Sequence, residues 1–427
     1  MSIGRVVPAR AIRVLATGLL GFALLGACAA IAPRARASTP AATSISATSG
    51  YTCASMSTGT VECWGKSYLP KTKSNVPRPA NGISGAIAVA TGARYNGALL
   101  ASHRIVCWGD DGYGQLGDGR TQDSGRPVEV VGISSAVAIS AGRTHACAVL
   151  TGGAVKCWGH NVQGALGNGS LRSSTTPVTV HGISNAIAIS AGLLKDTTCA
   201  LLATGEVRCW GSNHYGQLGN GRTASANVPV AVTGITDAVA IASSGQHACA
   251  VLASGAIDCW GDNDRGQLGD ASHHNSSTPV PVTGVTAATA VVAAPYGYTC
   301  AVVRPGSVYC WGHNSKNQLG NGLYPVGSVV PVPAVGITTA VALTAGMGHA
   351  CALLASGGAA CWGYDDYGQL GKGGGRPRIS NPVAVRFGAS APPAPRVRAH
   401  HRGMRRHAAH AGSTAGRQRP TGQARKR

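Results

Sequence analysis

The triplet Cys-Trp-Gly occurs seven times in this chain, at intervals of 44 to 52 residues, and contains every tryptophan. The triplets begin at Cys63, Cys107, Cys157, Cys209, Cys259, Cys310 and Cys361. Such a period is typical of solenoids and propellers, in which one unit cannot bury its apolar face without a neighbour. The repeat therefore predicts one domain of seven equivalent units, although length alone would suggest two or three domains.

Each unit contains four short runs rich in Val, Ile and Ala, separated by clusters of Gly, Asn, Ser and Thr. In the third unit these runs are residues 136–140 (AVAIS), 145–150 (HACAVL), 154–158 (AVKCW) and 177–180 (PVTV). They read as strands and turns, and no sustained helical period accompanies them. We therefore predict an all-β, seven-bladed β-propeller with four antiparallel strands per blade. The ring would close if the first and last strands shared one blade, and the borders between blades stay open.

The cysteines have a regular spacing of their own. Cys147 and Cys157 are symmetric about Gly152, the centre of an expected hairpin, and opposed residues of antiparallel strands are close enough for a disulfide. The same spacing pairs Cys53 with Cys63, Cys199 with Cys209, Cys249 with Cys259, Cys300 with Cys310, and Cys351 with Cys361. Free buried thiols or metal ligation are the alternatives, but no Cys-x-x-Cys spacing occurs. We expect six disulfides, no metal and no cofactor.

The second unit departs from this spacing. Gly97 stands where its first cysteine would be, which leaves Cys107 without a partner in the repeat. We interpret Cys107 as a buried unpaired thiol, and pairing between two molecules is the alternative.

A further motif follows the Cys-Trp-Gly triplet in most units. Gly-Gln-Leu-Gly stands at 114–117, 216–219, 266–269 and 368–371, with the variants GALG at 164–167 and NQLG at 317–320, and the first unit lacks it. With the pattern G-x-x-H-x-C-A-L-x-x-x-G-x-V-x-C-W-G, this motif resembles the regulator of chromosome condensation repeat family over about residues 43 to 388. The glycines are interpreted as turn residues, because glycine adopts positive φ freely.

The resemblance implies a fold more firmly than an activity. Nuclear members of the family are propellers that exchange nucleotide on a small GTPase and dock on chromatin, using an inserted wedge loop and acidic residues. Here the units are compact and nearly equal, and no residue can be matched to that exchange site. A secreted propeller of the same architecture instead inhibits β-lactamases by covering them with one face. Guanine-nucleotide exchange is therefore an alternative to a binding function.

The N-terminus resembles an export signal. Arginines precede an apolar run at residues 14–31, and Ala35–Ala37 offers small residues for cleavage, so residues 1–37 read as a signal peptide. Residues 25–28 (LGAC) also resemble a bacterial lipobox, in which Cys28 would be lipidated. No other segment is long and apolar enough to span a membrane. We therefore expect an exported bacterial member of the family, located outside the cell or in the cell envelope.

The charge is concentrated at the two ends of the chain. Of the net charge of +21, residues 389–427 carry ten Lys or Arg without any acid and residues 1–37 carry five, which leaves +6 for residues 38–388. The C-terminal segment reads as a disordered basic tail, which either attracts anionic polymers or only keeps the protein soluble. We expect no sequence-specific nucleic-acid binding, because no stacking aromatic residues accompany the charge.

Catalytic candidates are scarce. Aspartate pairs follow three of the Trp-Gly dipeptides and could serve a secreted polysaccharide-acting enzyme as acid and base, or could bind calcium. They are Asp110 and Asp111, Asp262 and Asp264, and Asp365 and Asp366. Aspartate is also common in turns, where its side chain bonds the local backbone. We therefore interpret these pairs as turn residues and expect no enzyme activity.

One position of the repeat carries His or Tyr in most units. Two residues before the first cysteine position stand Tyr51, Tyr95, His145, Thr197, His247, Tyr298 and His349. In a seven-fold ring these residues form a circle. They are either a functional ring or buried groups that each bond a neighbouring blade, as buried polar side chains generally do.

The segments after Trp-Gly differ among units while their frame repeats, and loops on a rigid scaffold commonly carry binding sites. Tyr and Arg dominate interface energetics, so the expected anchors are Tyr113, Tyr215, Arg265, Tyr364 and Tyr367. We therefore expect a monomeric, non-enzymatic scaffold whose loops bind an unknown protein or an anionic surface polymer.

Overall fold

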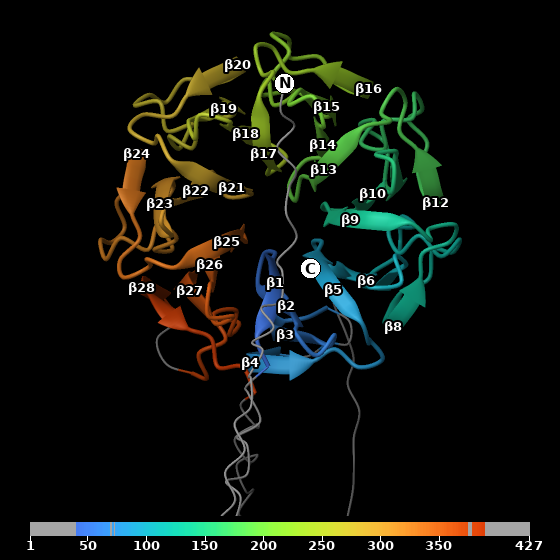
Figure 1. Ribbon diagram of the computed structural model, residues 1–427, viewed down its shortest axis with the longest axis horizontal. Coiled ribbons are helices and arrows are strands. Elements are labelled where there is room, and N and C mark those ends of the chain that lie inside the picture. The colour runs from blue at the N-terminus through green and yellow to red at the C-terminus, as the bar shows by residue number, and fades with distance from the viewer. Residues whose placement is uncertain (1–39, 69–70, 72, 375–377, 389–427) are drawn as a thin grey trace, which may run out of the picture. The chain divides into compact units, whose positions relative to one another are not determined.

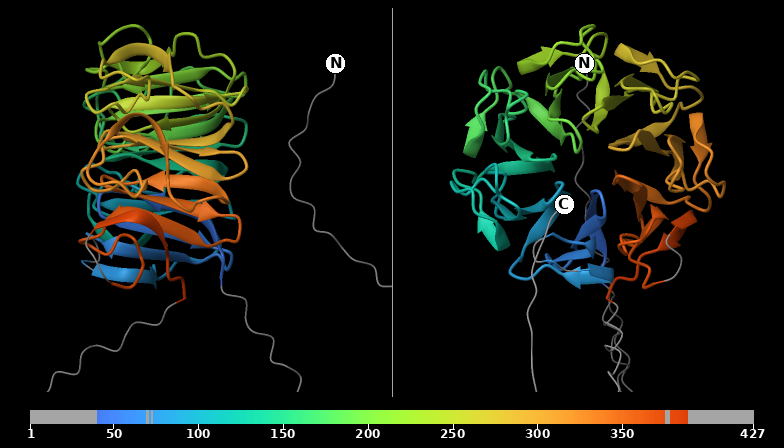
Figure 2. Two further views of the ribbon diagram at one scale, coloured as in Figure 1. Left: turned by 90° about the vertical axis from the view of Figure 1, so that its left-hand side faces the viewer. Right: turned by 180° about the vertical axis from the view of Figure 1, so that it is seen from behind.

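Seven antiparallel sheets of four strands each surround a common axis in the computed structural model of this chain, which describes residues 40–68, 71, 73–374 and 378–388 (Figure 1). Seen edge-on, the sheets of this ring form a short cylinder (Figure 2). The predicted seven-bladed propeller with four strands per blade is confirmed. The innermost strands β1, β5, β9, β13, β17, β21 and β25 face the axis (Figure 1).

The strands follow one another without interruption by any helix in the described residues. Blade 1 consists of β1 (Ala42–Ala47), β2 (Tyr51–Met56), β3 (Val61–Lys66) and β4 (Lys73–Pro79). Blade 2 consists of β5 (Ala86–Thr91), β6 (Tyr95–Leu100), β7 (Ile105–Gly109) and β8 (Ser124–Glu129). Blade 3 consists of β9 (Ala136–Ala141), β10 (His145–Leu150), β11 (Val155–Gly159) and β12 (Ser174–Thr179). Blade 4 consists of β13 (Ala186–Ala191), β14 (Thr197–Leu202), β15 (Val207–Gly211) and β16 (Ala226–Ala231).

The remaining three blades repeat the same order. Blade 5 consists of β17 (Ala238–Ser243), β18 (His247–Leu252), β19 (Ile257–Gly261) and β20 (Ser276–Pro281). Blade 6 consists of β21 (Ala288–Ala294), β22 (Tyr298–Val303), β23 (Ser307–Gly312) and β24 (Ser328–Pro333). Blade 7 consists of β25 (Ala340–Ala345), β26 (His349–Leu354), β27 (Ala359–Tyr364) and β28 (Arg378–Ala384).

The first and last strands do not share a blade, which corrects the expected mode of ring closure. β1 is the innermost strand of blade 1, and β28 is the outermost strand of blade 7. Blades 7 and 1 are joined instead by side-chain packing, in which Trp64 lies against Leu353 and Leu370. The amide of Ala47 also donates to Thr344 Oγ1 at 2.7 Å. Closure therefore uses the same contacts between neighbouring blades that hold the rest of the ring.

Six of the seven hairpins between the second and third strands carry a disulfide. Cys147 lies opposite Cys157 in the β10–β11 pair, with 4.0 Å between their Cα atoms. The six bridges are Cys53–Cys63, Cys147–Cys157, Cys199–Cys209, Cys249–Cys259, Cys300–Cys310 and Cys351–Cys361, as the spacing predicts. In blade 2, Gly97 lies opposite Cys107, which is a buried free thiol. Burial raises the pKa of Cys107 far above its usual range, so this thiol stays protonated and unreactive.

The hydrophobic core lies between neighbouring blades rather than within one. Six tryptophans are fully buried, and each donates its indole N–H to a backbone carbonyl in the Gly-Gln-Leu-Gly turn of the preceding blade, at 2.7 to 3.0 Å. The bonds are Trp64 to Gln369, Trp158 to Gln115, Trp210 to Ala165, Trp260 to Gln217, Trp311 to Gln267 and Trp362 to Gln318. The motif therefore covers the next blade's tryptophan.

The glycines of this motif are required by close packing. Gly117 has φ +73°, and a Cβ atom there would lie 2.8 Å from the ring of Trp158. Gly114 has φ +79°, and its Cβ would lie 2.6 Å from the Cα of Thr175 in the next blade. Any other residue would meet both backbone strain and a clash.

Blade 1 lacks this turn, and the difference is visible at its border with blade 2. Among the described residues, Trp108 has no carbonyl partner for its indole N–H, unlike the other six tryptophans. A groove of about 970 Å³ lies beside it, lined in part by Arg78 and Arg126. The border between blades 1 and 2 is thus less completely packed than the others.

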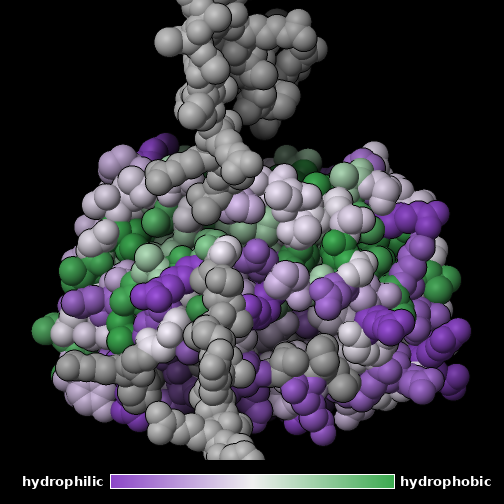
Figure 3. Space-filling view, turned by 90° about the horizontal axis from the view of Figure 1, so that it is seen from below, coloured by the Kyte–Doolittle hydropathy of each residue, from purple (hydrophilic) through white to green (hydrophobic). Residues whose placement is uncertain are grey.

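Figure 3 shows the ring edge-on, with hydrophilic residues prominent along its lower rim.

Candidate functional site

The residues of the predicted His/Tyr ring bond neighbouring blades. His145, His247 and His349 are fully buried, and the Nε2 atom of each lies 2.9 Å from a threonine hydroxyl of the next blade. These threonines are Thr198, Thr299 and Thr52 respectively, and each donates its own hydroxyl proton to a carbonyl at 2.8 to 3.2 Å. Because a hydroxyl has one proton to donate, the histidine must donate from Nε2. Each ring is therefore protonated on Nε2.

The pKa values of these histidines agree with that tautomer. Burial lowers the pKa of His247 and of His349 to about 3, and burial also lowers the pKa of His145. They therefore carry no charge near neutral pH and offer no titrating group to a ligand.

The other members of this position are less uniform. Tyr298 donates its hydroxyl to the carbonyl of His349 at 2.6 Å, and Tyr95 donates to the carbonyl of His145. Thr197 bonds the carbonyl of Ser212 at 2.8 Å within its own blade. Tyr51 is half-buried, and burial raises its pKa to about 12. Most of these contacts run between blades, while the Nδ1 atoms of His145 and His349 are buried without a hydrogen-bond partner in the described part of the chain.

The aspartate pairs lie in the turns of three separate blades. Asp111 Oδ1 accepts the backbone N–H of Leu116 at 2.8 Å, and Asp365 Oδ1 accepts that of Leu370 at 2.9 Å. Asparagine makes the same contact at the equivalent positions of the other blades, which are Asn161, Asn213, Asn263 and Asn314. In blade 5 the equivalent position is Asn263, and Asp262 and Asp264 stand on either side of it in the sequence. Asp262 accepts the backbone N–H of Asp264 at 3.3 Å. Asp111 and Asp365 therefore hold the Gly-Gln-Leu-Gly turns of blades 2 and 7 in place.

Asp111 differs from its equivalents in its second oxygen. Asn161 Nδ2 donates to the carbonyls of Ser170 and Arg172, each at 3.0 Å, and Asp365 Oδ2 pairs with Lys372 at 2.6 Å. Asp111 Oδ2 is buried without a hydrogen-bond partner. Burial raises the pKa of Asp111 to about 6, against the opposing effect of its bond with Leu116.

We expect Asp111→Asn to stabilise the protein at neutral pH by on the order of 1 to 2 kcal/mol, because it removes an unsatisfied buried acceptor. The pKa of Asp111 is higher in the folded state, about 6, than the ordinary aspartate value of 3.8. Its contribution to stability is therefore fully present at low pH and is lost as pH rises through the folded pKa. The gain from the substitution should accordingly grow between about pH 4 and pH 6, and thermal unfolding at several pH values measures it.

Asp365→Asn is the matched control for this prediction, since it removes the partner of Lys372. We expect this control to be neutral or destabilising at every pH. A gain for Asp111→Asn that did not change between pH 4 and pH 7.5 would contradict the assignment of the raised pKa to this carboxyl.

A pocket lies at the axis on the face formed by the loops that join the first two strands of each blade. The segments after the Trp-Gly dipeptides reach the same face, because β2 and β3 pair so that Tyr51 lies opposite Gly65. The cavity measures about 440 Å³, a size common for ligand sites, and blades 1, 2, 3, 6 and 7 contribute its wall. The wall contains the cations Lys66, Arg94, Arg143 and Lys316 and the tyrosines Tyr68, Tyr296, Tyr364 and Tyr367.

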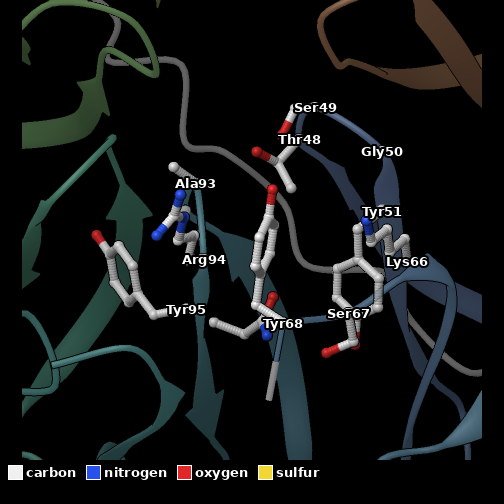
Figure 4. Close-up of a pocket in the computed structure, with 12 residues that line it drawn as sticks. Thr48, Ser49, Gly50, Tyr51, Lys66, Ser67, Tyr68, Ala93, Arg94 and Tyr95 are labelled. Atoms are coloured by element: carbon white, nitrogen blue, oxygen red, sulfur yellow. The ribbon is translucent and has the colours of Figure 1, made fainter. Parts of the chain in front are cut away.

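Three of the four cations lie over tyrosine rings. Lys66 Nζ is 5.2 Å from the ring centroid of Tyr367, and Lys316 Nζ is 5.2 Å from that of Tyr364. The guanidinium carbon of Arg94 is 4.9 Å from the ring centroid of Tyr68. Figure 4 shows Tyr68 between Arg94 on one side and Lys66 on the other, where a smaller pocket adjoins the axial one. Such contacts hold a cation in place without neutralising it.

The axial pocket has no acidic residue in its wall. Within the described part of the chain, none of its four cations takes part in an ion pair. The nearby carboxylates are Asp110, whose charge interacts with Arg94, and Asp366, which bonds Tyr364. The hydrogen bond with Asp366 raises the pKa of Tyr364 to about 12. The wall of the pocket itself therefore carries only positive charge, and the nearest carboxylates lie outside it.

The expected anchors are only partly brought together. Tyr364 and Tyr367 form an edge-to-face pair, with their centroids 5.9 Å apart, in the wall of the axial pocket. Tyr113 lies outside that wall, half-exposed, with its ring centroid 4.6 Å from that of His160. Tyr215 and Arg265 also lie outside the wall, in blades 4 and 5. Their backbone amides bond Gln217 and Gln267 within their own turns.

Sequence reasoning missed most of the pocket. Arg143 and Tyr296 stand two residues before the ring position of their blades, and Arg94 stands one residue before it. The residues just before the ring position vary among blades, as do those after Trp-Gly. Their variability is the sequence signal that could have identified them as candidates for binding. Lys66 and Tyr68 were missed because blade 1 lacks the Gly-Gln-Leu-Gly motif.

Metal and membrane features are absent from the part of the chain that the structure covers. No group of three or more His, Cys, Asp or Glu residues is arranged there to hold a metal ion. No helix of these residues has the length and apolarity to cross a membrane. The expected signal peptide at 1–37, Cys28 and the basic tail at 389–427 lie outside the described residues.

Much of the ring matches a known repeat. Two patterns, each described as "Regulator of chromosome condensation (RCC1) repeat", together match more than half of the chain. The first matches residues 102–149, 204–251, 254–303 and 305–353, and the second matches 136–165, 186–217 and 238–267.

Solved structures with a similar fold include a human and a yeast protein. Human WBSCR16 superposes with a TM-score of 0.65 at 21% identity, covering 74% of this chain and 86% of that one. Yeast RCC1 (Prp20), in its complex with Kap60, gives a TM-score of 0.65 at 19% identity, with coverages of 76% and 83%. Prp20p from Saccharomyces cerevisiae, whose binding to Gsp1p and histones was also studied, gives 0.64 at 20% identity, with coverages of 76% and 85%. At these identities the likeness concerns the fold.

Proposed function

We propose that this chain, which belongs to the regulator of chromosome condensation repeat family, is an exported, non-enzymatic bacterial propeller. One face of the ring binds a protein or an anionic surface polymer. The observation that carries this proposal is the axial pocket, where four cations and four tyrosines from five blades meet with no acid in the wall. Tyr and Arg are enriched in binding interfaces, and a rigid ring presents them in a fixed arrangement. The family accounts for the propeller fold, and the proposed binding role rests on the pocket.

Export is supported by the cysteines. Six disulfides in one domain suit an oxidising compartment outside the cytoplasm, since cytosolic thiols are kept reduced. The signal-like segment at 1–37 leads to the same location, by cleavage after Ala37 or by lipidation of Cys28. Exchange on a cytosolic GTPase would place the protein on the other side of the membrane, so we do not propose it.

The test compares the two faces of the ring by sedimentation with cell envelopes isolated from the native host. The face variant carries Tyr113→Ala, Tyr364→Ala and Tyr367→Ala, which removes tyrosines from the face that holds the axial pocket. The control variant carries Thr151→Ala and Ser254→Ala, which are exposed at the opposite ends of the strands. We expect wild type and control to sediment with the envelopes and the face variant to stay in solution. Equal sedimentation of all three proteins would refute binding through this face.

A further inference from the structure

We propose that the axial pocket binds an acidic peptide segment of a partner protein, whose carboxylates pair with Lys66, Arg94, Arg143 and Lys316. This inference rests on the proposed binding function and names the chemistry of its ligand. Four cations line a cavity of about 440 Å³ that has no acid in its wall. Like charges held close together repel, and their positions cost free energy unless an anion offsets them. The pocket is thus arranged for a ligand with several negative charges.

The donors of these cations are unoccupied. Within the described residues, the side chains of Arg94, Arg143, Lys66 and Lys316 make no hydrogen bond and no ion pair, whereas Arg104 pairs with Glu129 at 2.6 Å. Each arginine offers five N–H donors and each lysine three. With its plane near the Tyr68 ring, Arg94 keeps the edge of its guanidinium available for bidentate contact with a carboxylate.

The chain's own ends do not suit this pocket. Residues 389–427 carry ten Lys or Arg and no acid, and residues 1–37 carry five and no acid. Both segments share the sign of the pocket and are repelled by it. Neither segment offers the negative charge that the pocket would attract.

The wall of the pocket favours a peptide over a simple polyanion. Met347, Ala93 and the tyrosine rings add apolar groups to the wall beside the cations. A polyphosphate offers these apolar groups nothing to contact, whereas a peptide can place apolar side chains between its carboxylates. Tyr and Arg together are the composition found at the centres of protein interfaces.

Close packing fixes two walls of the pocket before a ligand arrives. A Cβ on Gly50 would lie 2.8 Å from the ring of Tyr367, and one on Gly348 would lie 3.2 Å from Lys316. These glycines allow the Tyr367 ring and the Lys316 stem to lie directly on the loops. Pre-organised groups lose less entropy on binding than mobile ones.

The experiment uses the full exported chain and fluorescence anisotropy of a labelled peptide of sequence Glu-Leu-Glu-Glu-Tyr-Glu. The matched probe replaces each Glu by Gln. We expect the acidic probe to bind and the neutral probe to bind at least ten-fold more weakly, with affinity falling as salt is raised. The variant Arg94→Gln with Lys316→Gln should weaken binding of the acidic probe at least ten-fold. The control Arg172→Gln with Arg222→Gln changes the charge equally, at exposed positions outside the pocket wall, and should bind as wild type does.

Each other outcome overturns the inference in a distinct way. If neither probe binds, or if both double variants weaken binding equally, the pocket is not an acidic-peptide site. If polygalacturonate or polyphosphate binds and is lost in the Arg94→Gln, Lys316→Gln variant while the peptide does not bind, the ligand is a surface polymer. The proposed function then stands without the peptide. If envelope sedimentation also persists in the face variant, the proposed function fails independently of the peptide result.

Discussion

Replacing Trp260 by alanine is expected to lower the free energy of unfolding by about 3 to 5 kcal/mol, the range found for large aromatic deletions in cores. Trp260 is fully buried between blades 4 and 5, in a cluster with Leu218 and Val232. Its indole N–H donates to the carbonyl of Gln217 at 3.0 Å, so the substitution also leaves that buried acceptor without its partner. Thermal or denaturant unfolding followed by circular dichroism measures the loss.

The natural control for this substitution is Trp108→Ala. Trp108 is 3% exposed, borders the groove between blades 1 and 2, and has no carbonyl partner among the described residues, whereas Trp260 bonds Gln217. We expect its loss to be smaller, by about 1 kcal/mol, because no hydrogen bond is broken and less packing is lost. Equal losses at the two positions would mean that the Gly-Gln-Leu-Gly turn adds nothing to the tryptophan contact.

Removing one disulfide should cost about 3 kcal/mol, the chain-entropy value for a loop of this length. The double variant Cys249→Ala, Cys259→Ala opens one bridge, whose cysteines are ten residues apart. Reduction of all six bridges should abolish the folded ring at 37 °C, since six such losses exceed the stability of an ordinary domain. The measurement is the midpoint of thermal unfolding with and without reductant, with thiols counted by alkylation and mass.

Blade 2 supplies the reverse experiment. Gly97 lies opposite Cys107, so Gly97→Cys should form a seventh bridge and consume the free thiol. A Cβ at Gly97 would lie 3.3 Å from Cys107 Sγ but 2.6 Å from Ile139 Cδ1, so the end of that side chain must move. We therefore expect a smaller gain than 3 kcal/mol. A Gly97→Cys protein that kept two alkylatable thiols at these positions would show that blade 2 cannot accept the bridge.

The repeat contained enough information for the fold and the disulfides. The spacing of Cys147 and Cys157 is local, because a hairpin brings together residues at a fixed distance along the chain. Seven Cys-Trp-Gly triplets at similar intervals predict seven similar blades, and such blades can bury their apolar faces only against one another. The closure of the ring did not follow from this pattern. A periodic sequence shows the length of the repeat but not the residue at which each blade begins. β1 and β28 could therefore have shared a blade, but the structure places them in different blades.

The sequence marks variable loop segments, but it does not show which of them meet in the axial pocket. Arg94 and Lys316 are separated by more than two hundred residues, yet both line one cavity. The sequence alone determined which units repeat, which cysteines pair and which turns need glycine, because each of these depends on neighbours along the chain. Only the tertiary structure decided which variable residues meet, because closing the ring brings the loops of separate blades to one axis.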